Sequence, residues 1–161
     1  MAEYPTKYFG TIAINENSGF ESINVEYANN KINISLADCN FYGDKLKVCL
    51  DIIDNYIELN EIAKMTILDN LDVKSFFNRH FDLLEEEITE IFGVKDFNDI
   101  EVKEVIEKLN YPDLFFDIQN NEIQVSVDYH FSSKYSDEIL CVKMDEQFSI
   151  VDFLHESKKR Q

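Results

Sequence analysis

Apolar and polar residues alternate at every second position in the first forty residues of the chain. The alternation is clearest over residues 12–14, 23–27 and 32–36. A period of two places one side of each segment against a core and is typical of β-strands. Asn29-Asn30, between the last two segments, favours a tight hairpin turn because Asn tolerates positive φ. The sequence therefore predicts antiparallel strands over about residues 7–37.

The apolar period changes to three and four residues from about residue 44 to residue 110. This spacing is typical of helices with one buried face. A first helix is predicted with Asp44 as its N-cap and with apolar positions that continue to Ile57. The same pattern continues over residues 59–67 and indicates a second, short helix.

The most regular stripe of apolar side chains covers residues 73–91. Asp72 is the predicted N-cap of this helix, and Gly93 is predicted to end it in the left-handed conformation. A last helix is predicted to begin at Asp99 and to end at Tyr111-Pro112, since the residue before a proline avoids the helical conformation.

Alternation returns over residues 114–118, 123–131 and 140–144, and less regularly over 148–154, with Asn120-Asn121 as a second hairpin turn. Strands followed by helices and then strands are the segregated pattern of an α+β domain. We therefore expect a single domain over residues 1–161, with N-terminal antiparallel strands, central helices and a C-terminal antiparallel meander over about residues 113–155. The two groups of strands fit one sheet with the helices on one face.

The composition combines a large apolar fraction with a strong negative charge. Hydrophobic residues make up 45% of the chain, and 32 acidic against 15 basic residues give a formal net charge of −17. The apolar and aromatic content argues against disorder. The charge argues against nucleic acid, anionic membranes and phosphate-rich ligands as partners, because a negative surface repels all of them.

The first residues carry neither a basic segment nor an apolar stretch typical of a signal peptide, and no apolar run approaches the roughly 18 residues that span a bilayer. We therefore expect a cytoplasmic location. Cys39, Cys49 and Cys141 are odd in number and widely spaced, and we interpret them as reduced thiols.

Sequence signatures of chemistry are missing. The chain has no phosphate-binding glycine loop, no His-Glu-x-x-His, no Cys-x-x-Cys and no Gly-x-Ser-x-Gly. Residues 96–107 have the length of a calcium loop, but Glu101 stands where that loop requires Gly and Ile100 where it requires an oxygen ligand. We expect no catalytic residue, no metal and no cofactor.

Two groups of residues remain as candidates for binding a partner. Asp128 and His130 are two positions apart on a predicted strand and so share a face, which suits a metal, a base with its orienting carboxylate, or a chance pairing in so acidic a chain. The acidic run over residues 82–90 is either the solvated back of a helix or a docking face for a basic protein. Its candidate contact residues are Glu85, Glu86, Glu87 and Glu90.

Five segments together resemble an uncharacterised bacterial family of small acidic cytoplasmic proteins. They are residues 8–12, 128–129, 135–142, 144–145 and 155–157. The resemblance implies an opening strand hairpin, helices and closing strands. Such families are similar to, and sometimes grouped with, immunity proteins that neutralise toxins in bacterial competition. The resemblance supplies no catalytic residues.

These observations favour a non-enzymatic protein-binding module, most concretely an immunity-type inhibitor of a basic toxin. One alternative is a small enzyme or metal-binding protein that uses the strand face of Asp128 and His130. Another is a structural subunit or a homodimer that pairs through a sheet edge.

Overall fold

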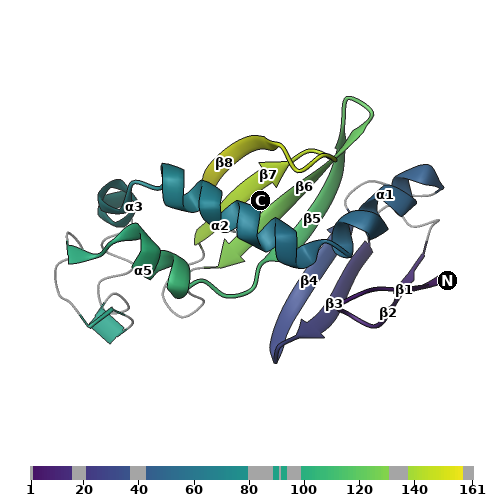
Figure 1. Ribbon diagram of the computed structural model, residues 1–161, viewed down its shortest axis with the longest axis horizontal. Coiled ribbons are helices and arrows are strands. Elements are labelled where there is room, and N and C mark those ends of the chain that lie inside the picture. Colours follow the sequence, from purple (N-terminus) through teal and green to yellow (C-terminus); the bar gives the residue numbers. More distant parts are fainter. Residues whose placement is uncertain are drawn as a thin grey trace.

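The computed structural model describes residues 2–15, 21–36, 43–79, 89–90, 92–93, 99–130 and 138–157, without the side chains of 77–79, 138–139 and 155–157. Eight strands and several helices follow one another in these residues (Figure 1). The strands are β1 (Ala2–Pro5), β2 (Thr11–Ile14), β3 (Glu21–Tyr27), β4 (Asn30–Leu36), β5 (Asp113–Gln119), β6 (Glu122–His130), β7 (Glu138–Met144) and β8 (Ile150–Ser157). The helices are α1 (Asp44–Ile53), α2 (Tyr56–Asn70), α3 (Val73–Arg79) and α5 (Val102–Glu107).

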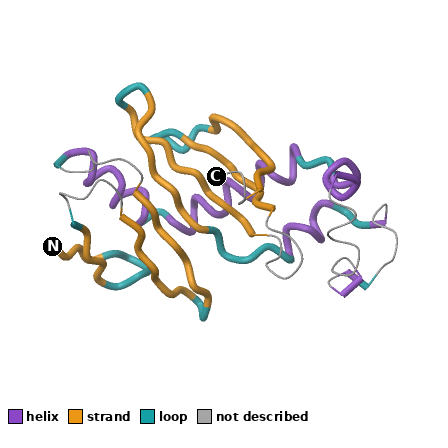
Figure 2. The backbone as a smooth tube through the Cα atoms, turned by 180° about the vertical axis from the view of Figure 1, so that it is seen from behind, coloured by secondary structure: helices purple, strands orange, loops and turns teal. Residues whose placement is uncertain are grey.

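Strands β3 to β8 form one sheet in the order β3-β4-β5-β6-β7-β8. All neighbours are antiparallel except β4 and β5, which run parallel. Strands β1 and β2 form a separate hairpin. Helices α1 and α2 lie along one face of the large sheet, and α3 and α5 lie beyond its end, as Figures 1 and 2 show from opposite sides. The predicted α+β class, with N-terminal strands and a C-terminal meander, is confirmed.

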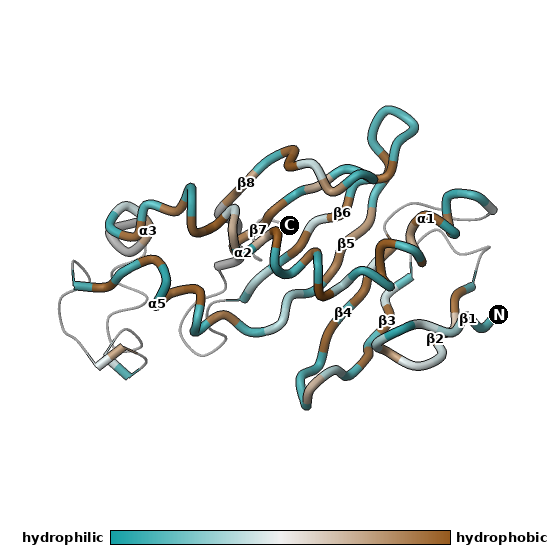
Figure 3. The backbone as a smooth tube through the Cα atoms, viewed as in Figure 1, coloured by the Kyte–Doolittle hydropathy of each residue, from teal (hydrophilic) through white to brown (hydrophobic). Residues whose placement is uncertain are grey.

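The hydrophobic core lies between this sheet and helices α1 and α2. Every second residue of the central strands faces the helices and is buried, and hydropathy alternates accordingly along the strands (Figure 3). The amphipathic face of α2 meets them with Leu59, Ala63 and Ile67. On this side of the sheet, the buried positions are Ile32, Ile34, Leu36, Leu114, Phe116, Ile123, Val125, Val127, Tyr129, Leu140, Val142 and Met144, whereas Ser35, Ser126 and Cys141 are buried on the opposite side.

Two buried tyrosines connect the helical layer to the strand segments. The Tyr129 hydroxyl of β6 hydrogen-bonds to the side-chain and backbone oxygens of Asn60 in α2. The Tyr56 hydroxyl donates to the carbonyl of Pro112 over 2.6 Å, just before β5. Burial raises the pKa of both phenols, so both stay protonated and serve as donors.

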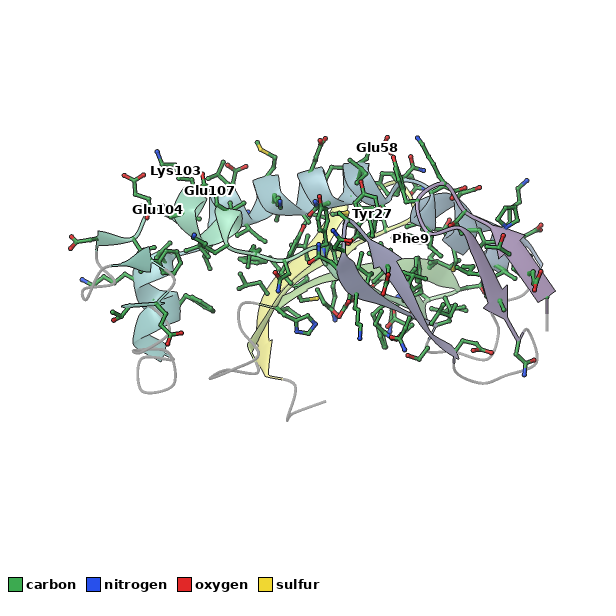
Figure 4. All side chains as sticks on the ribbon, turned by 90° about the horizontal axis from the view of Figure 1, so that it is seen from below. Phe9, Tyr27, Glu58, Lys103, Glu104 and Glu107 are labelled. Carbon is green, nitrogen blue, oxygen red and sulfur yellow. The ribbon has the colours of Figure 1, made fainter. Side chains whose placement is uncertain are left out.

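An aromatic cluster joins the β1–β2 hairpin region to the rest of the domain. Phe9 packs edge-on against Tyr27 and Tyr56, with ring centroids 6.1 and 5.0 Å away. Tyr27 packs edge-on against Tyr111 at 5.1 Å. Edge-to-face pairs of this kind are favourable beyond their buried area. Phe9 and Tyr27 lie side by side below α2 in Figure 4.

The turn predictions are partly confirmed. Asn120 and Asn121 both have positive φ, at 53° and 66°, as the tight turn between β5 and β6 requires. In the hairpin of β3 and β4, the positive φ values belong to Ala28 and Asn29, because Asn30 already pairs with Tyr27. That prediction was wrong by one position. Strand β1 was not predicted.

The helix boundaries differ from the prediction at three places. The N-cap of α1 is Gly43, so Asp44 lies in the first turn of α1, where its negative charge interacts favourably with the helix dipole. The first helix ends at Ile53 and α2 begins at Tyr56, so Ile57 belongs to the second helix, which has 15 residues and is not short. The Asn55 side chain donates to the Asp51 carbonyl over 2.8 Å at this break.

The last helix is shorter than predicted. It begins after Glu101 instead of at Asp99, and the Glu104 side chain accepts a hydrogen bond from the Glu101 N–H over 3.3 Å. This contact is one half of a capping box, with Glu in place of the usual Ser or Thr. The helix ends at Glu107, before Tyr111-Pro112.

Two predicted helix ends are confirmed, and part of one helix cannot be compared. The Asp72 carboxylate accepts the Ser75 N–H over 3.1 Å, as an N-cap does. Gly93 has φ 68° and bonds back to Thr89. Residues 80–88 and 91 of the predicted helix over 73–91 lie outside the described residues. Phe148 precedes β8 and lies in a turn with φ 65°.

Candidate functional site

The face of the six-stranded sheet opposite the helices is polar, and we call it the open face. Figure 2 views the sheet from this side, and no described helix lies in front of it. Strand register aligns its side chains in rows across the sheet. Its polar residues are Ser22, Asn24, Glu26, Lys31, Asn33, Ser35, Asp113, Asp117, Gln119, Glu122, Gln124, Ser126, Asp128, His130, Lys143 and Asp152, and Phe115, Cys141 and Leu154 lie among them.

Asp113 lies at the centre of the open face and contacts two neighbouring strands. Its Oδ2 lies 2.8 Å from Nε2 of His130 in β6, and its Oδ1 accepts the backbone N–H of Asn33 in β4 over 2.8 Å. The side chains of Asp113 and His130 are 26% and 25% exposed, so a partner molecule can reach both. A carboxylate held from two sides in this way has a fixed position.

Asp128 and His130 share the open face, as their spacing predicts. Asp128 stands directly opposite Asp113 in register, and His130 follows two residues later. The carboxylate that contacts His130 is nevertheless Asp113, which lies 17 residues away in the sequence. The sequence analysis missed Asp113, because only the register between β5 and β6 brings it to His130.

An amide and hydroxyl network extends the site across β3 and β4. The Asn33 side-chain amide donates to Ser22 Oγ over 2.7 Å and to Asn24 Oδ1 over 3.1 Å. The Ser35 hydroxyl donates to the Asn33 Oδ1. Because these side chains are short and hold one another, this part of the open face is ordered before any partner arrives.

The open face is locally acidic. It carries six carboxylates, from Glu26, Asp113, Asp117, Glu122, Asp128 and Asp152, against the ammonium groups of Lys31 and Lys143, a balance of −4 when His130 is neutral. Asp113, Asp117 and Asp128 are half-buried, and the other three are exposed. This arrangement suits the recognition of Lys or Arg side chains, which hydrogen-bond most strongly to carboxylates.

The arrangement offers limited chemistry. An imidazole paired with a carboxylate can exchange a proton or bind a cation. Within the part of the chain that the structure describes, no group of three or more His, Cys, Asp or Glu side chains is placed to hold a metal ion.

The acidic run predicted as a docking face is only partly described. Glu85, Glu86 and Glu87 lie outside the described residues. Glu90 is described and exposed. Of the six predicted contact residues, the structure therefore brings together Asp128 and His130.

No protein-family model, curated protein or solved structure matches this chain. The resemblance to a family of small acidic bacterial proteins stays a prediction. Among the described helices, none combines the length and apolar character needed to cross a membrane.

Proposed function

We propose that this chain is a non-enzymatic protein-binding module whose open face receives a basic protein. The proposal rests mainly on the Asp113 carboxylate, which contacts both His130 and the Asn33 N–H and lies opposite Asp128. These residues lie on a sheet face that no described helix covers. Folding a sheet onto a helical layer needs one apolar face only. The acidic groups on the other face are not part of that packing and can serve recognition.

The charge of the whole chain supports the same partner class. A net charge of −17 attracts a basic protein over long distances and speeds its association. The same charge disfavours nucleic acid and anionic membranes. The open face then supplies short-range contacts, because its Asp side chains can pair with Lys or Arg of the partner.

The finer form of the proposal is an immunity-type inhibitor that acts in the cytoplasm on a basic toxin. It rests on the resemblance described above and on the acidity of the chain. An acidic sheet can cover the basic active site of a toxin that acts on nucleic acid, in the place of the substrate phosphates. The predicted partner is the basic protein encoded beside this chain.

The test measures the affinity for that neighbouring protein by calorimetry at several salt concentrations. Asp113→Asn combined with Asp128→Asn removes two open-face charges. The control, Glu58→Gln combined with Asp69→Asn, removes two exposed charges from α2. We expect the open-face variant to bind about tenfold more weakly at low salt and the control to stay within about twofold.

Two results would contradict the proposal. Equal losses in both double variants would mean that only the net charge matters and that the open face is not the contact surface. Absence of binding to the neighbouring basic protein, with both proteins folded, would remove the toxin partner. A survival assay in cells that express the neighbouring protein then separates inhibition from simple binding.

A further inference from the structure

A groove of about 480 Å³ lies between α2 and α5, away from the open face. Met65 and Leu68 of α2 and Ile106 of α5 form its apolar part. Met65 is 57% exposed and Leu68 is 40% exposed. Figure 4 shows α5 beside the end of α2, with Lys103 and Glu107 on the side away from the sheet.

The exposed apolar residues in this groove are not part of the hydrophobic core. Among the described residues, the other large exposed apolar side chains are Ile150 and Val151 at the start of β8. Helix α2 already packs its buried face on the sheet, so Met65 and Leu68 do not contribute to the core. Exposed apolar residues grouped in a concave site with a polar rim are typical of protein interfaces.

The charges around the groove differ from those of the rest of the surface. Its rim carries two acids, Glu61 and Glu107, and two bases, Lys64 and Lys103, so the lining is electrically balanced on a chain of net charge −17. Lys103 also lies 3.3 Å from Glu101, but both side chains are about two-thirds exposed, and such a pair is weak and easily exchanged.

A balanced rim offers a strongly basic partner no surplus of negative charge at the contact, and it suits a second copy of the chain. Two molecules of net charge −17 repel each other at most points of their surfaces, and least where the local charge is zero. In a two-fold symmetric pair the same patch meets itself, so acids and bases on one rim can face bases and acids on the other. The apolar residues of both copies then bury one another.

We infer that this chain forms a homodimer through the groove between α2 and α5. The surface is small, so the dimer is weak, with a dissociation constant on the order of micromolar or higher. The open face stays accessible in this dimer, because it lies on the other side of the sheet. The inference therefore does not depend on the proposed function.

The test is sedimentation equilibrium of the full chain over a wide concentration range. Met65→Ser combined with Leu68→Ser should raise the dimer dissociation constant about tenfold or more. The matched control, Ile150→Ser combined with Val151→Ser, removes two equally exposed apolar side chains at β8 and should leave the constant within about twofold. All the substituted side chains are exposed, so both variants should keep the melting temperature of the parent.

Salt gives a second, independent readout. Added salt screens the repulsion between two chains of net charge −17, so the dimer should strengthen as salt rises. A complex with a basic protein should weaken under the same change, so the two interactions are distinguishable. A monomer at every concentration overturns the inference. A dimer weakened only by the β8 variant also overturns it and places the interface at the sheet edge.

Discussion

His130 and Asp113 lie diagonally across β6 and β5, with Nε2 of the imidazole 2.8 Å from Oδ2 of the carboxylate. The other oxygen of Asp113 accepts the backbone N–H of Asn33 in β4. One side chain thus connects three adjacent strands, β4, β5 and β6. The Asp113 side chain both stabilises the sheet and contributes negative charge to the open face. Substitutions that keep its hydrogen bond but remove its charge can separate these two roles.

Replacing Asp113 with Ala should destabilise the protein by about 1–3 kcal/mol, because the Asn33 N–H loses its acceptor in a partly buried position. Asp113→Asn should cost less, since its amide oxygen can still accept that N–H. The measurement is the free energy of unfolding in urea. Asp117→Ala is the control, and it should change stability by less than about 0.5 kcal/mol, because the contact of Asp117 with Gln119 is exposed. Equal stability of Asp113→Ala and the parent would contradict the role of this carboxylate.

Replacing Tyr129 with Phe should destabilise the protein by about 1–3 kcal/mol. The hydroxyl is the donor to Asn60, which is buried, and its loss leaves the Asn60 oxygen without that donor. Tyr27→Phe is the matched control, because its ring packs in the aromatic cluster and its hydroxyl makes no hydrogen bond to another described residue. Urea unfolding of both variants checks the expectation, and similar losses in the two would exclude a special role for the Tyr129 hydroxyl.

Stability should fall as the pH rises above about 10, the usual pKa of a tyrosine. Burial raises the pKa of Tyr56 and Tyr129 in the folded state. Above that pH the unfolded chain releases these two protons and the folded chain keeps them, so alkali favours unfolding, and their contribution is complete only at lower pH. Absorbance at 295 nm should show that these two of the eight tyrosines ionise only as the protein unfolds. Titration of all eight before any loss of circular dichroism would disprove this.

Replacing Gly43 with Ala should destabilise the protein by about 1–3 kcal/mol through the backbone alone. Gly43 has φ 59° and ψ −129°, a conformation that residues with a side chain avoid. A Cβ at this position would meet nothing within 4 Å, so steric contact adds no cost. Thermal unfolding is the measurement. Lys47→Ala, one turn later and exposed, is the comparison, and a melting point of Gly43→Ala as high as that of Lys47→Ala would exclude strain at this position.

The sequence predicted those features of the fold that a single segment encodes. Residues 32–36 alternate because one side of β4 is buried, so the strand is visible in the sequence without its neighbours. The turn at Asn120-Asn121 is visible because few residues other than Gly and Asn accept positive φ. The end of a helix at Gly93 was predictable for the same reason.

Features that depend on which strands become neighbours were not predictable. The side chains of β4 and β5 do not indicate that the two strands pair in parallel, and the contact between Asp113 and His130 follows from strand register. The start of α5 was missed because Glu101 is an unusual N-cap, whereas Asp99 is a common type. Strand β1 was missed because Ala2–Pro5 is short and ends in proline.

The parallel pairing of β4 with β5 has a consequence for how the sheet assembles. Its register covers three residue pairs, Ile34 with Leu114 through Leu36 with Phe116, whereas the hairpins on either side each cover seven. The paired residues of β4 and β5 are eighty positions apart in the sequence, so forming this pairing, the seam of the sheet, costs far more chain entropy than forming either hairpin. We expect the two hairpins to form early and this seam to close late. Under mechanical load the same seam is where the sheet should first divide in two.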